Sequence, residues 1–545
     1  EEYFNQYAQY NSESTNGGLI VPNQFFIKNS KQQASFNAYK FNTKRIVSTI
    51  FMIGTSWKNQ LFLDITGRND WSSALVYSYG TGNFSYFYPS VSGSWIITET
   101  FKDKLPKWVS FAKVRGSWAQ VGNDTSPYYI NSGYSVATYQ RGDKKIYGMT
   151  IPENMKSTNL KPERKNAWEV GLDWRFFDSR IGVDLTYYKE NTRNQIMTIN
   201  VPWESGVKEK LINAGNIQNS GIEIALNTTP IKKKQWQWDL NFTYTRNRNK
   251  IVELSPDVTS YINLDGAANY GNYRIASVAK VGSDYGMLMS DSWIKTDEKT
   301  GKPVVGYTNK FRTVYYKRGG TVKEVGSMLP NFLGSLNSTL RWKDLSLYVL
   351  FDARFGGYVA SYNSRYATAY GFSGETEKYR KGMTWTSKYA NAQDKVFTDG
   401  FIPDVVFDAG TIVTTPEGTN QDVSGMTYQE AYEKGYVEPA HLQSAAYFKN
   451  SWGTGVINDD WFKKINYIAL REITLSYNVP TKICSYIGAK NLSLSFTGRN
   501  LAYLLNTAPN HENPESVRGT GAAQFRMRSF MPYTASYLFT LNATF

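Results

Sequence analysis

The sequence has almost no residues that cross-link chains or bind soft metals. Cys484 is the only cysteine among 545 residues, and the two histidines, His441 and His511, lie far apart in the chain. One cysteine excludes an internal disulfide and a thiolate metal cluster, and the histidines follow no zinc-binding spacing. We therefore expect no metal site and no cofactor.

Long hydrophobic runs are also absent. Hydrophobic residues make up 41% of the chain, and no stretch approaches the roughly 18 consecutive apolar residues that a membrane-spanning helix needs. This excludes a helical membrane protein. It leaves open a membrane β-barrel, because barrel strands are short and only half apolar. Aromatic residues, in contrast, are abundant, at 15% of the chain.

The sequence shows no active site and no nucleic-acid motif. Lysine and arginine (61) outnumber aspartate and glutamate (46), but the basic residues are scattered and their densest cluster is 232–234. The glycine pairs 319–320 and 356–357 lack the lysine and the strand–helix setting of a phosphate loop. Acidic pairs such as 459–460 are expected by chance. We predict neither an enzyme nor a nucleic-acid-binding protein.

Alternation of apolar and polar residues recurs along nearly the whole chain. In 236–245 the even positions are Trp, Trp, Leu, Phe and Tyr, whereas the odd positions are Gln, Asp, Asn, Thr and Thr. Successive side chains of a strand point to opposite faces, so this pattern predicts one apolar and one polar face. The same alternation occurs in segments that begin at Trp168, Ile181, Leu345, Leu492 and Tyr537. Polar side chains expected to point inward include Asp173, Arg175, Asp239, Asn241, Thr243 and Asp352.

Short and long connections tend to alternate between these segments. The short ones are expected at 177–180, 229–234 and 342–344, and the long ones at 122–165, 293–328, 357–460 and 500–531. Roughly fourteen strands of about ten residues, joined by short periplasmic turns and long extracellular loops, are typical of an outer-membrane barrel. The sequence therefore predicts an all-β protein, a transmembrane antiparallel β-barrel.

Aromatic residues favour the same fold. Membrane barrels carry Trp and Tyr where the apolar band meets the lipid headgroups. We expect five such residues at or near strand ends: Trp168, Trp174, Tyr187, Trp236 and Trp342. The alternative is a soluble β-sandwich or propeller, which would bury Val, Ile and Leu and join most strands by short turns.

Several segments resemble TonB-dependent outer-membrane transporters. These are 159–163 (NLKPE) with 168–173 (WEVGLD), then 187–189 (YYK), 213–216 (NAGN) and 219–223 (NSGIE). Four more are similar to the SusC/RagA branch of Bacteroidota: 64–73 (DITGRNDWSS), 88–92 with Trp95, 113–123 (KVRGSWAQVGN) and 470–480 (LREITLSYNVP). The matches follow one another in the family's order from about residue 60 to the end.

The resemblance implies that residues 1–545 are the C-terminal portion of such a transporter, about fourteen strands of a roughly 22-stranded barrel in the outer membrane of a Gram-negative, Bacteroidota-type bacterium. The plug domain and the first strands are not in this chain on that reading. The implied function is energised import of bulky nutrients, either oligosaccharides or oligopeptides. A passive porin or surface adhesin, or a soluble carbohydrate-binding β protein, remains an alternative.

The resemblance also implies partners. TonB would act through the missing N-terminal part, a SusD-like surface lipoprotein would cap the barrel, and two transporter–lipoprotein pairs would form a dimer. Aromatic rings in extracellular loops can stack on sugars or contact the cap. The candidates for such contacts are Trp203, Trp293, Trp385, Tyr389 and Trp452. The terminal Phe545 is similar to the signal that the barrel-assembly machinery reads.

Overall fold

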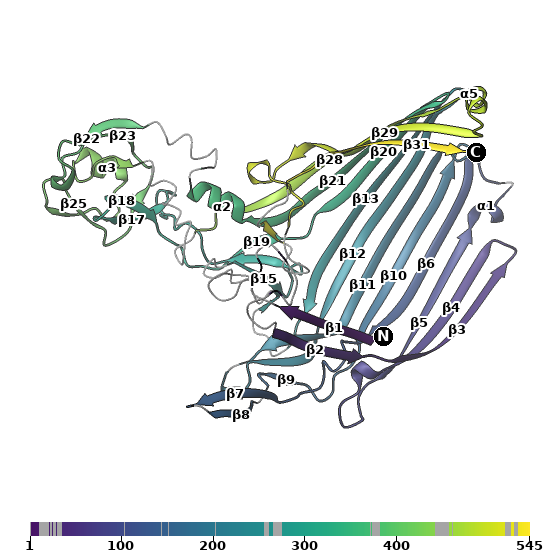
Figure 1. Ribbon diagram of the computed structural model, residues 1–545, viewed down its shortest axis with the longest axis horizontal. Helices are drawn as coiled ribbons and strands as arrows, with labels where there is room; N and C mark the ends of the chain where they lie inside the picture. Colours follow the sequence, from purple (N-terminus) through teal and green to yellow (C-terminus); the bar gives the residue numbers. More distant parts are fainter. Residues whose placement is uncertain are drawn as a thin grey trace.

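The computed structural model describes residues 2–9, 21, 24, 29, 35–102, 104–142, 144–150, 152–201, 203–255, 261–264, 275–370, 372, 382–441, 457–459, 461–517, 525–527 and 532–545. Its main feature is one large, curved sheet of 15 strands (Figure 1). The long strands pair antiparallel in chain order: β3 (Ile46–Trp57), β4 (Leu61–Ser72), β5 (Ser85–Ile96), β6 (Val109–Asn123), β10 (Glu163–Phe176), β11 (Ile181–Asn200), β12 (Glu209–Lys232), β13 (Trp236–Glu253), β20 (Phe332–Trp342), β21 (Leu345–Ser361), β28 (Phe462–Asn478), β29 (Asn491–Asn506) and β31 (Ser536–Thr544).

The sheet is all-β and antiparallel along this path, as the alternation predicted. β3 and β31 form its two ends, and within the described residues no pairing joins them. None of the helices in the described part of the chain is long and apolar enough to cross a bilayer.

The register of the strands collects apolar side chains on one face. Val170 lies beside Tyr187, and Tyr187 lies beside Ile222 on the next strand. Near the other end of the sheet, Leu475 lies beside Phe496, which lies beside Phe539. These side chains are exposed, Phe539 by 72%. An exposed apolar surface that continues over the whole sheet is the surface that a barrel presents to lipid.

The opposite face carries polar pairs between neighbouring strands. Asn241 Nδ2 donates to Asn337 Oδ1 at 2.7 Å, and the hydroxyls of Thr243 and Ser335 are 2.7 Å apart. Arg115 Nη1 lies 3.1 Å from Asp184 Oδ2. The two faces thus differ as the sequence predicted.

Short connections join the strands at one end of the sheet, and two of them contain the helices α1 (Ile97–Thr100) and α5 (Thr481–Tyr486). The turn 177–180 is confirmed, with Phe177, Asp178 and Ser179 all at positive φ. The turn expected at 229–234 is shorter and begins later. A register shift between Thr228 and Ile231 lets β12 continue to Lys232, and the turn occupies 233–235 instead.

Aromatic side chains mark two levels of the apolar face. At the short-turn end, Trp236 stacks on Trp342 with ring centroids 5.6 Å apart. The second level lies about eight residues from the short-turn end of β10. There Trp168 lies beside Trp118, with ring centroids 6.1 Å apart. A tilted strand needs about 9–11 residues to cross the bilayer, so a spacing of about eight is close to the separation of its two interfaces.

Two of the five predicted aromatic positions need correction. Trp168 and Tyr187 lie within β10 and β11 rather than at strand ends. Both strands continue beyond the apolar band, so an interface residue there is not a terminal residue.

Long connections lie at the opposite end and contain small sheets (Figure 1). The short β9 (Asn154–Lys156) and β30 (Arg526–Met527) pair in parallel with β12 and β21. The remaining elements are β1 (Glu2–Gln9), β2 (Ser35–Thr43), η2 (Ser73–Leu75), β7 (Ser135–Arg141), β8 (Lys144–Thr150), η3 (Trp203–Ser205), β14 (Tyr261–Asn263), β15 (Ile275–Lys280), β16 (Met287–Ser290), β19 (Lys323–Ser327), α2 (Tyr362–Ala369) and η8 (Pro509–His511).

Two of the long connections fold together into one outer lobe, which lies at the far left of Figure 1. β17 (Val304–Thr308) belongs to the β13–β20 connection, and it pairs in parallel with β24 (Val406–Phe407) of the β21–β28 connection. Phe407 and Tyr428 are fully buried in the core that both connections share. The lobe also contains β18 (Thr313–Tyr316), β22 (Met383–Thr386), η5 (Ala390–Ala392), β23 (Val396–Phe401), β25 (Ile412–Thr414), β26 (Asn420–Asp422), α3 (Tyr428–Glu433) and β27 (Ala440–His441).

The apolar face yields a direct test. Leu172 lies between the two aromatic levels of β10, beside Leu185. We expect Leu172→Arg to lower the free energy of unfolding of the full protein in lipid vesicles by about 2–4 kcal/mol, because the charge would lie near the bilayer midplane. Denaturant titration measures this.

Thr243→Arg, on the polar face, is the matched control, and it should change stability by less than about 1 kcal/mol. Equal losses for the two variants would contradict the assignment of the faces.

Candidate functional site

A β-bulge in β28 places an arginine on the polar face of the sheet. Glu472 pairs with Leu350 and Leu470 pairs with the next residue, Phe351, so Arg471 is an extra residue in the strand. An extra residue reverses the alternation and redirects a side chain. As a result both Glu472 and Arg471 lie on the polar face, where Arg471 meets acidic partners.

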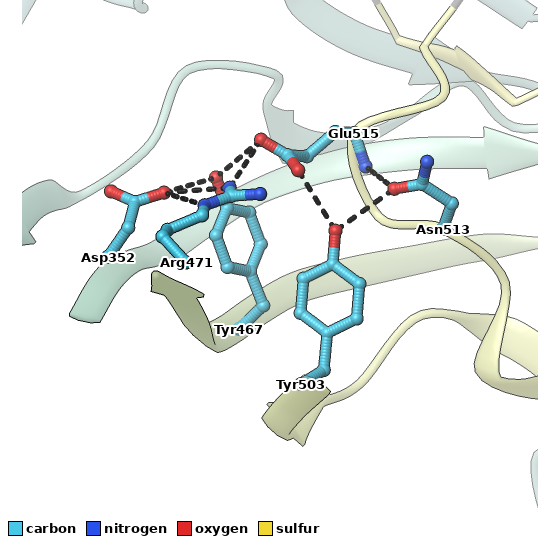
Figure 2. A network of polar contacts seen from close by, with 6 residues as sticks. All are labelled: Asp352, Tyr467, Arg471, Tyr503, Asn513 and Glu515. Carbon is cyan, nitrogen blue, oxygen red and sulfur yellow. Dashed lines mark hydrogen bonds and ion pairs between the residues drawn. The ribbon is translucent and has the colours of Figure 1, made fainter. Parts of the chain in front are cut away.

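Arg471 joins the wall of the sheet to the last long connection (Figure 2). Its Nη2 lies 2.8 Å from Asp352 Oδ2 on β21 and 2.6 Å from Glu515 Oε1 in the β29–β31 connection. Its Nε makes a second contact with Asp352 Oδ2, at 3.2 Å. An arginine between two carboxylates forms charge-assisted hydrogen bonds, which are stronger than neutral ones.

Tyrosine hydroxyls fix the same carboxylate from the strands. The Tyr503 hydroxyl donates to Glu515 Oε2 at 2.9 Å, and the Tyr467 hydroxyl lies 3.3 Å from Oε1. Within the connection, the Glu515 N–H donates to Asn513 Oδ1 at 3.1 Å. Residues 513–515 are therefore held against the polar face (Figure 2).

The pKa values of two glutamates in this connection are shifted in opposite directions. Burial disfavours the charged form of Glu515, but hydrogen bonds from Arg471 and Tyr503 outweigh it and hold the pKa of Glu515 below its ordinary value. Within the described residues, the Glu512 carboxylate has neutral hydrogen-bond partners, Ser361 and Asn363, each at 3.5 Å. Burial therefore raises the pKa of Glu512 to about 7.

The structure places the predicted contact residues Trp385 and Tyr389 inside the outer lobe. Trp385 Nε1 donates to Glu438 Oε2 at 3.2 Å, and its ring stacks on Phe397 with centroids 5.0 Å apart. Tyr389 is 7% exposed, and its hydroxyl donates to the Thr414 carbonyl at 3.0 Å. Both side chains contribute to the packing of the lobe.

The other predicted contact residues are scattered. Trp293 is half-buried, donates through Nε1 to the Ser290 carbonyl at 2.7 Å and packs against Phe462. Trp203 lies in η3, and Trp452 falls outside the described residues. Among the described residues, Trp203, Trp293 and the pair in the lobe do not come together at one site, and the ligand role of all five residues stays a prediction.

Phe545 follows β31 at the short-turn end, and its side chain is 71% exposed. Lys490 Nζ lies 3.1 Å from its main-chain oxygen. Its role as an assembly signal also stays a prediction.

Sequence reasoning missed Arg471, Glu515, Tyr503 and Asn513. One signal was present. Ile473 and Leu475 occupy the apolar phase of β28, and strict alternation would place Arg471 in that phase too. A charge at a lipid-facing position indicates a bulge. No local pattern indicates Glu515 as its partner, since that residue lies in an irregular connection.

Among the described residues, no group of three or more His, Cys, Asp or Glu side chains could hold a metal ion. What the arrangement of Figure 2 provides is a set of fixed charges on the polar wall, supplied by two strands and one long connection.

Curated relatives match over parts of their length. TonB-dependent receptor P26 of Formosa agariphila is 23% identical over 486 residues, which cover 87% of this chain and 43% of that protein. TonB-dependent receptor SusC of Bacteroides thetaiotaomicron is 27% identical over 270 residues, covering 48% of this chain and 26% of SusC. The chain thus spans less than half the length of these relatives.

Solved structures share the fold. The RagAB peptide transporter superposes with a TM-score of 0.64 at 15% identity, covering 97% of this chain and 51% of that chain. The RagAB peptide importer in the "closed-closed" state gives a TM-score of 0.65 at 16% identity, covering 97% and 51%.

The anchoring role of Arg471 can be tested by measuring local opening of the connection through hydrogen exchange. We expect Arg471→Leu to increase hydrogen exchange at the Glu515 and Ser516 amides about tenfold or more, because Asp352 and Glu515 lose their shared cation. Mass spectrometry of the full protein measures the exchange. Arg499→Leu is the control, since Arg499 pairs with Glu472 and not with the connection. Unchanged exchange in Arg471→Leu would contradict the anchoring role.

Glu512 predicts a pH dependence of the same connection. Its pKa is raised in the folded state, so the folded state binds more protons between about pH 4.5 and pH 7. The stability that Glu512 contributes to the folded connection is fully present below the pKa of the unfolded state. It is lost as pH rises through about 7, and the loss amounts to up to about 3 kcal/mol. Exchange of 506–512, corrected for intrinsic rates, should therefore increase from pH 5 to pH 8.

Glu512→Gln should remove most of this dependence, because the amide does not titrate in this range. A full pH dependence in the Gln variant would contradict the assignment to Glu512.

A family model described as "TonB dependent receptor-like, beta-barrel" matches residues 2–359, more than half of the chain. The match agrees with the continuous amphipathic sheet and the long connections at one end. The chain belongs to the TonB-dependent receptor-like β-barrel family. It is a SusC/RagA-like barrel sheet of the outer membrane of Bacteroidota-type Gram-negative bacteria.

Proposed function

We propose that this chain forms part of the barrel of an energised outer-membrane importer of bulky nutrients, oligopeptides or oligosaccharides. The observation that carries the proposal is the sheet itself, with a lipid-facing apolar surface, a polar inner surface and long connections at one end. A wall of this kind encloses a hydrated passage, and large connections at its outer mouth give room for cargo contacts.

Further strands and a plug complete the barrel in this proposal. β3 and β31 each have one neighbour in the sheet of described residues, and unpaired backbone groups are costly in lipid. The chain also spans about half the length of the RagAB neighbours. Residues 1–545 would thus be the C-terminal portion of the transporter, with Phe545 as its assembly signal.

TonB, a SusD-like lipoprotein cap and a dimer of transporter–lipoprotein pairs are the proposed partners. Support comes from the relationship to SusC and from the likeness to the RagAB structures. The outer lobe and the neighbouring connections, with Trp203, Trp293, Trp385, Tyr389 and Trp452, are the proposed region for cap or cargo contact.

The proposal is tested by energised uptake. Cells that carry the complete transporter should accumulate labelled oligopeptides or oligosaccharides, and accumulation should fall to the level of a deletion strain when TonB is absent. The control is a strain that lacks TonB but expresses a general porin, which should still take up a small passive solute. Uptake that is independent of TonB would instead favour the passive porin.

A further inference from the structure

A pocket of about 350 Å³ opens on the polar face beside the network of Figure 2. Arg354 of β21, Tyr467 of β28 and Glu515 of the β29–β31 connection contribute its polar groups. A volume near the lower limit for small-molecule sites fits the end of an oligomer rather than a whole one.

Arg354 differs from the other arginines of this face. Arg115, Arg471 and Arg499 each form an ion pair with a carboxylate. Among the described residues, Arg354 donates only to main-chain carbonyls, from Nε to Gly356 at 3.4 Å and from Nη2 to Met328 at 3.3 Å. Within the described residues, no carboxylate lies in ion-pair distance of Arg354.

The contacts of Arg354 leave its guanidinium able to take a ligand. Both carbonyl contacts are long, and Nη1 makes no hydrogen bond to the described residues. A planar guanidinium with free N–H groups is suited to bind a carboxylate through two parallel hydrogen bonds. Arg354 is also half-buried, so a bound anion would be partly shielded from water.

Glu515 supplies the opposite charge at the same pocket. Its Oε1 accepts from Arg471 and Tyr467, whereas its Oε2 accepts from Tyr503 alone among the described residues. A carboxylate oxygen has two lone pairs, so Oε2 can accept one more N–H. The pocket therefore offers a cation for an anionic group and, from a fixed carboxylate, an acceptor for a neighbouring N–H.

Apolar side chains form the rest of the wall. Met328, Leu329 and Pro330 come from the connection before β20, and Val517 follows Glu515 in its connection. Sugar rings are held by exposed aromatic faces. Tyr467, the one aromatic residue among the described residues of this wall, is 6% exposed and packs edge-on against Tyr503. This wall fits an aliphatic side chain better than it fits a uronic acid.

We propose that this pocket binds the C-terminal residue of a peptide: Arg354 holds the terminal carboxylate, Glu515 accepts the last amide N–H, and the apolar wall holds an aliphatic last side chain. The last residue of a peptide presents these three groups on one Cα atom and its immediate neighbours. The inference rests on the proposed import function and names the part of the cargo that this wall recognises.

The test compares two forms of one peptide on the purified, complete transporter in detergent. The probe is the pentapeptide Gly-Ser-Gly-Ala-Leu with a free carboxylate, and its partner is the same peptide with a C-terminal amide. Calorimetry should show at least about tenfold tighter binding of the acid. Arg354→Gln should reduce binding of the acid to the level of the amide, and Arg354→Lys should retain part of the preference.

Arg499→Gln is the matched control, because Arg499 lies on the same face outside the pocket, and it should keep the preference for the acid. Equal binding of acid and amide by the unsubstituted protein would overturn the proposal without any variant. A preference that persists in Arg354→Gln would overturn it too. Arg354-dependent binding of tetragalacturonate with no binding of the peptide acid would overturn the peptide assignment.

The outcome separates this inference from the proposed function. Calorimetry on purified protein does not require TonB. A preference for the acid without energised uptake in cells would overturn the importer and leave the pocket. Energised uptake of peptides with equal binding of acid and amide would overturn the pocket and leave the importer.

Discussion

Backbone hydrogen bonding between neighbouring strands governs this structure. In lipid an unpaired N–H or C=O group costs several kcal/mol, so every membrane strand needs a neighbour on both sides. The antiparallel register pairs the backbone groups, and it also makes paired residues of neighbouring strands point to the same face. Val170, Tyr187 and Ile222 are one such row. The separation of apolar and polar surfaces is therefore a property of the sheet as a whole.

One departure from this register is coupled to the polar chemistry of the wall. A single extra residue in β28 brings Arg471 to the polar face, and Arg471 holds Glu515 of a distant connection. Through Glu515 the bulge also shapes the pocket beside Arg354. A backbone irregularity thus supports a site that ideal strands would not form.

The sheet could be predicted from the sequence because the two faces meet different solvents. Because of that difference, apolar and polar residues alternate in segments such as 236–245. The tight turn 177–180 also depends on adjacent residues only. The site could not be predicted in the same way. Arg471 and Glu515 are brought together by tertiary folding, and the aromatic residues Trp385 and Tyr389 pack within a lobe whose two halves are far apart in sequence.

That shared lobe links two stretches of chain that the sheet keeps separate. β17 and β24 come from different connections, yet Phe407 and Tyr428 are buried in a single core that both complete. Removing the packed residues of one connection would therefore expose the core that the other connection helps to form. The two are expected to change together in evolution, as one inherited unit carried on two pairs of strands.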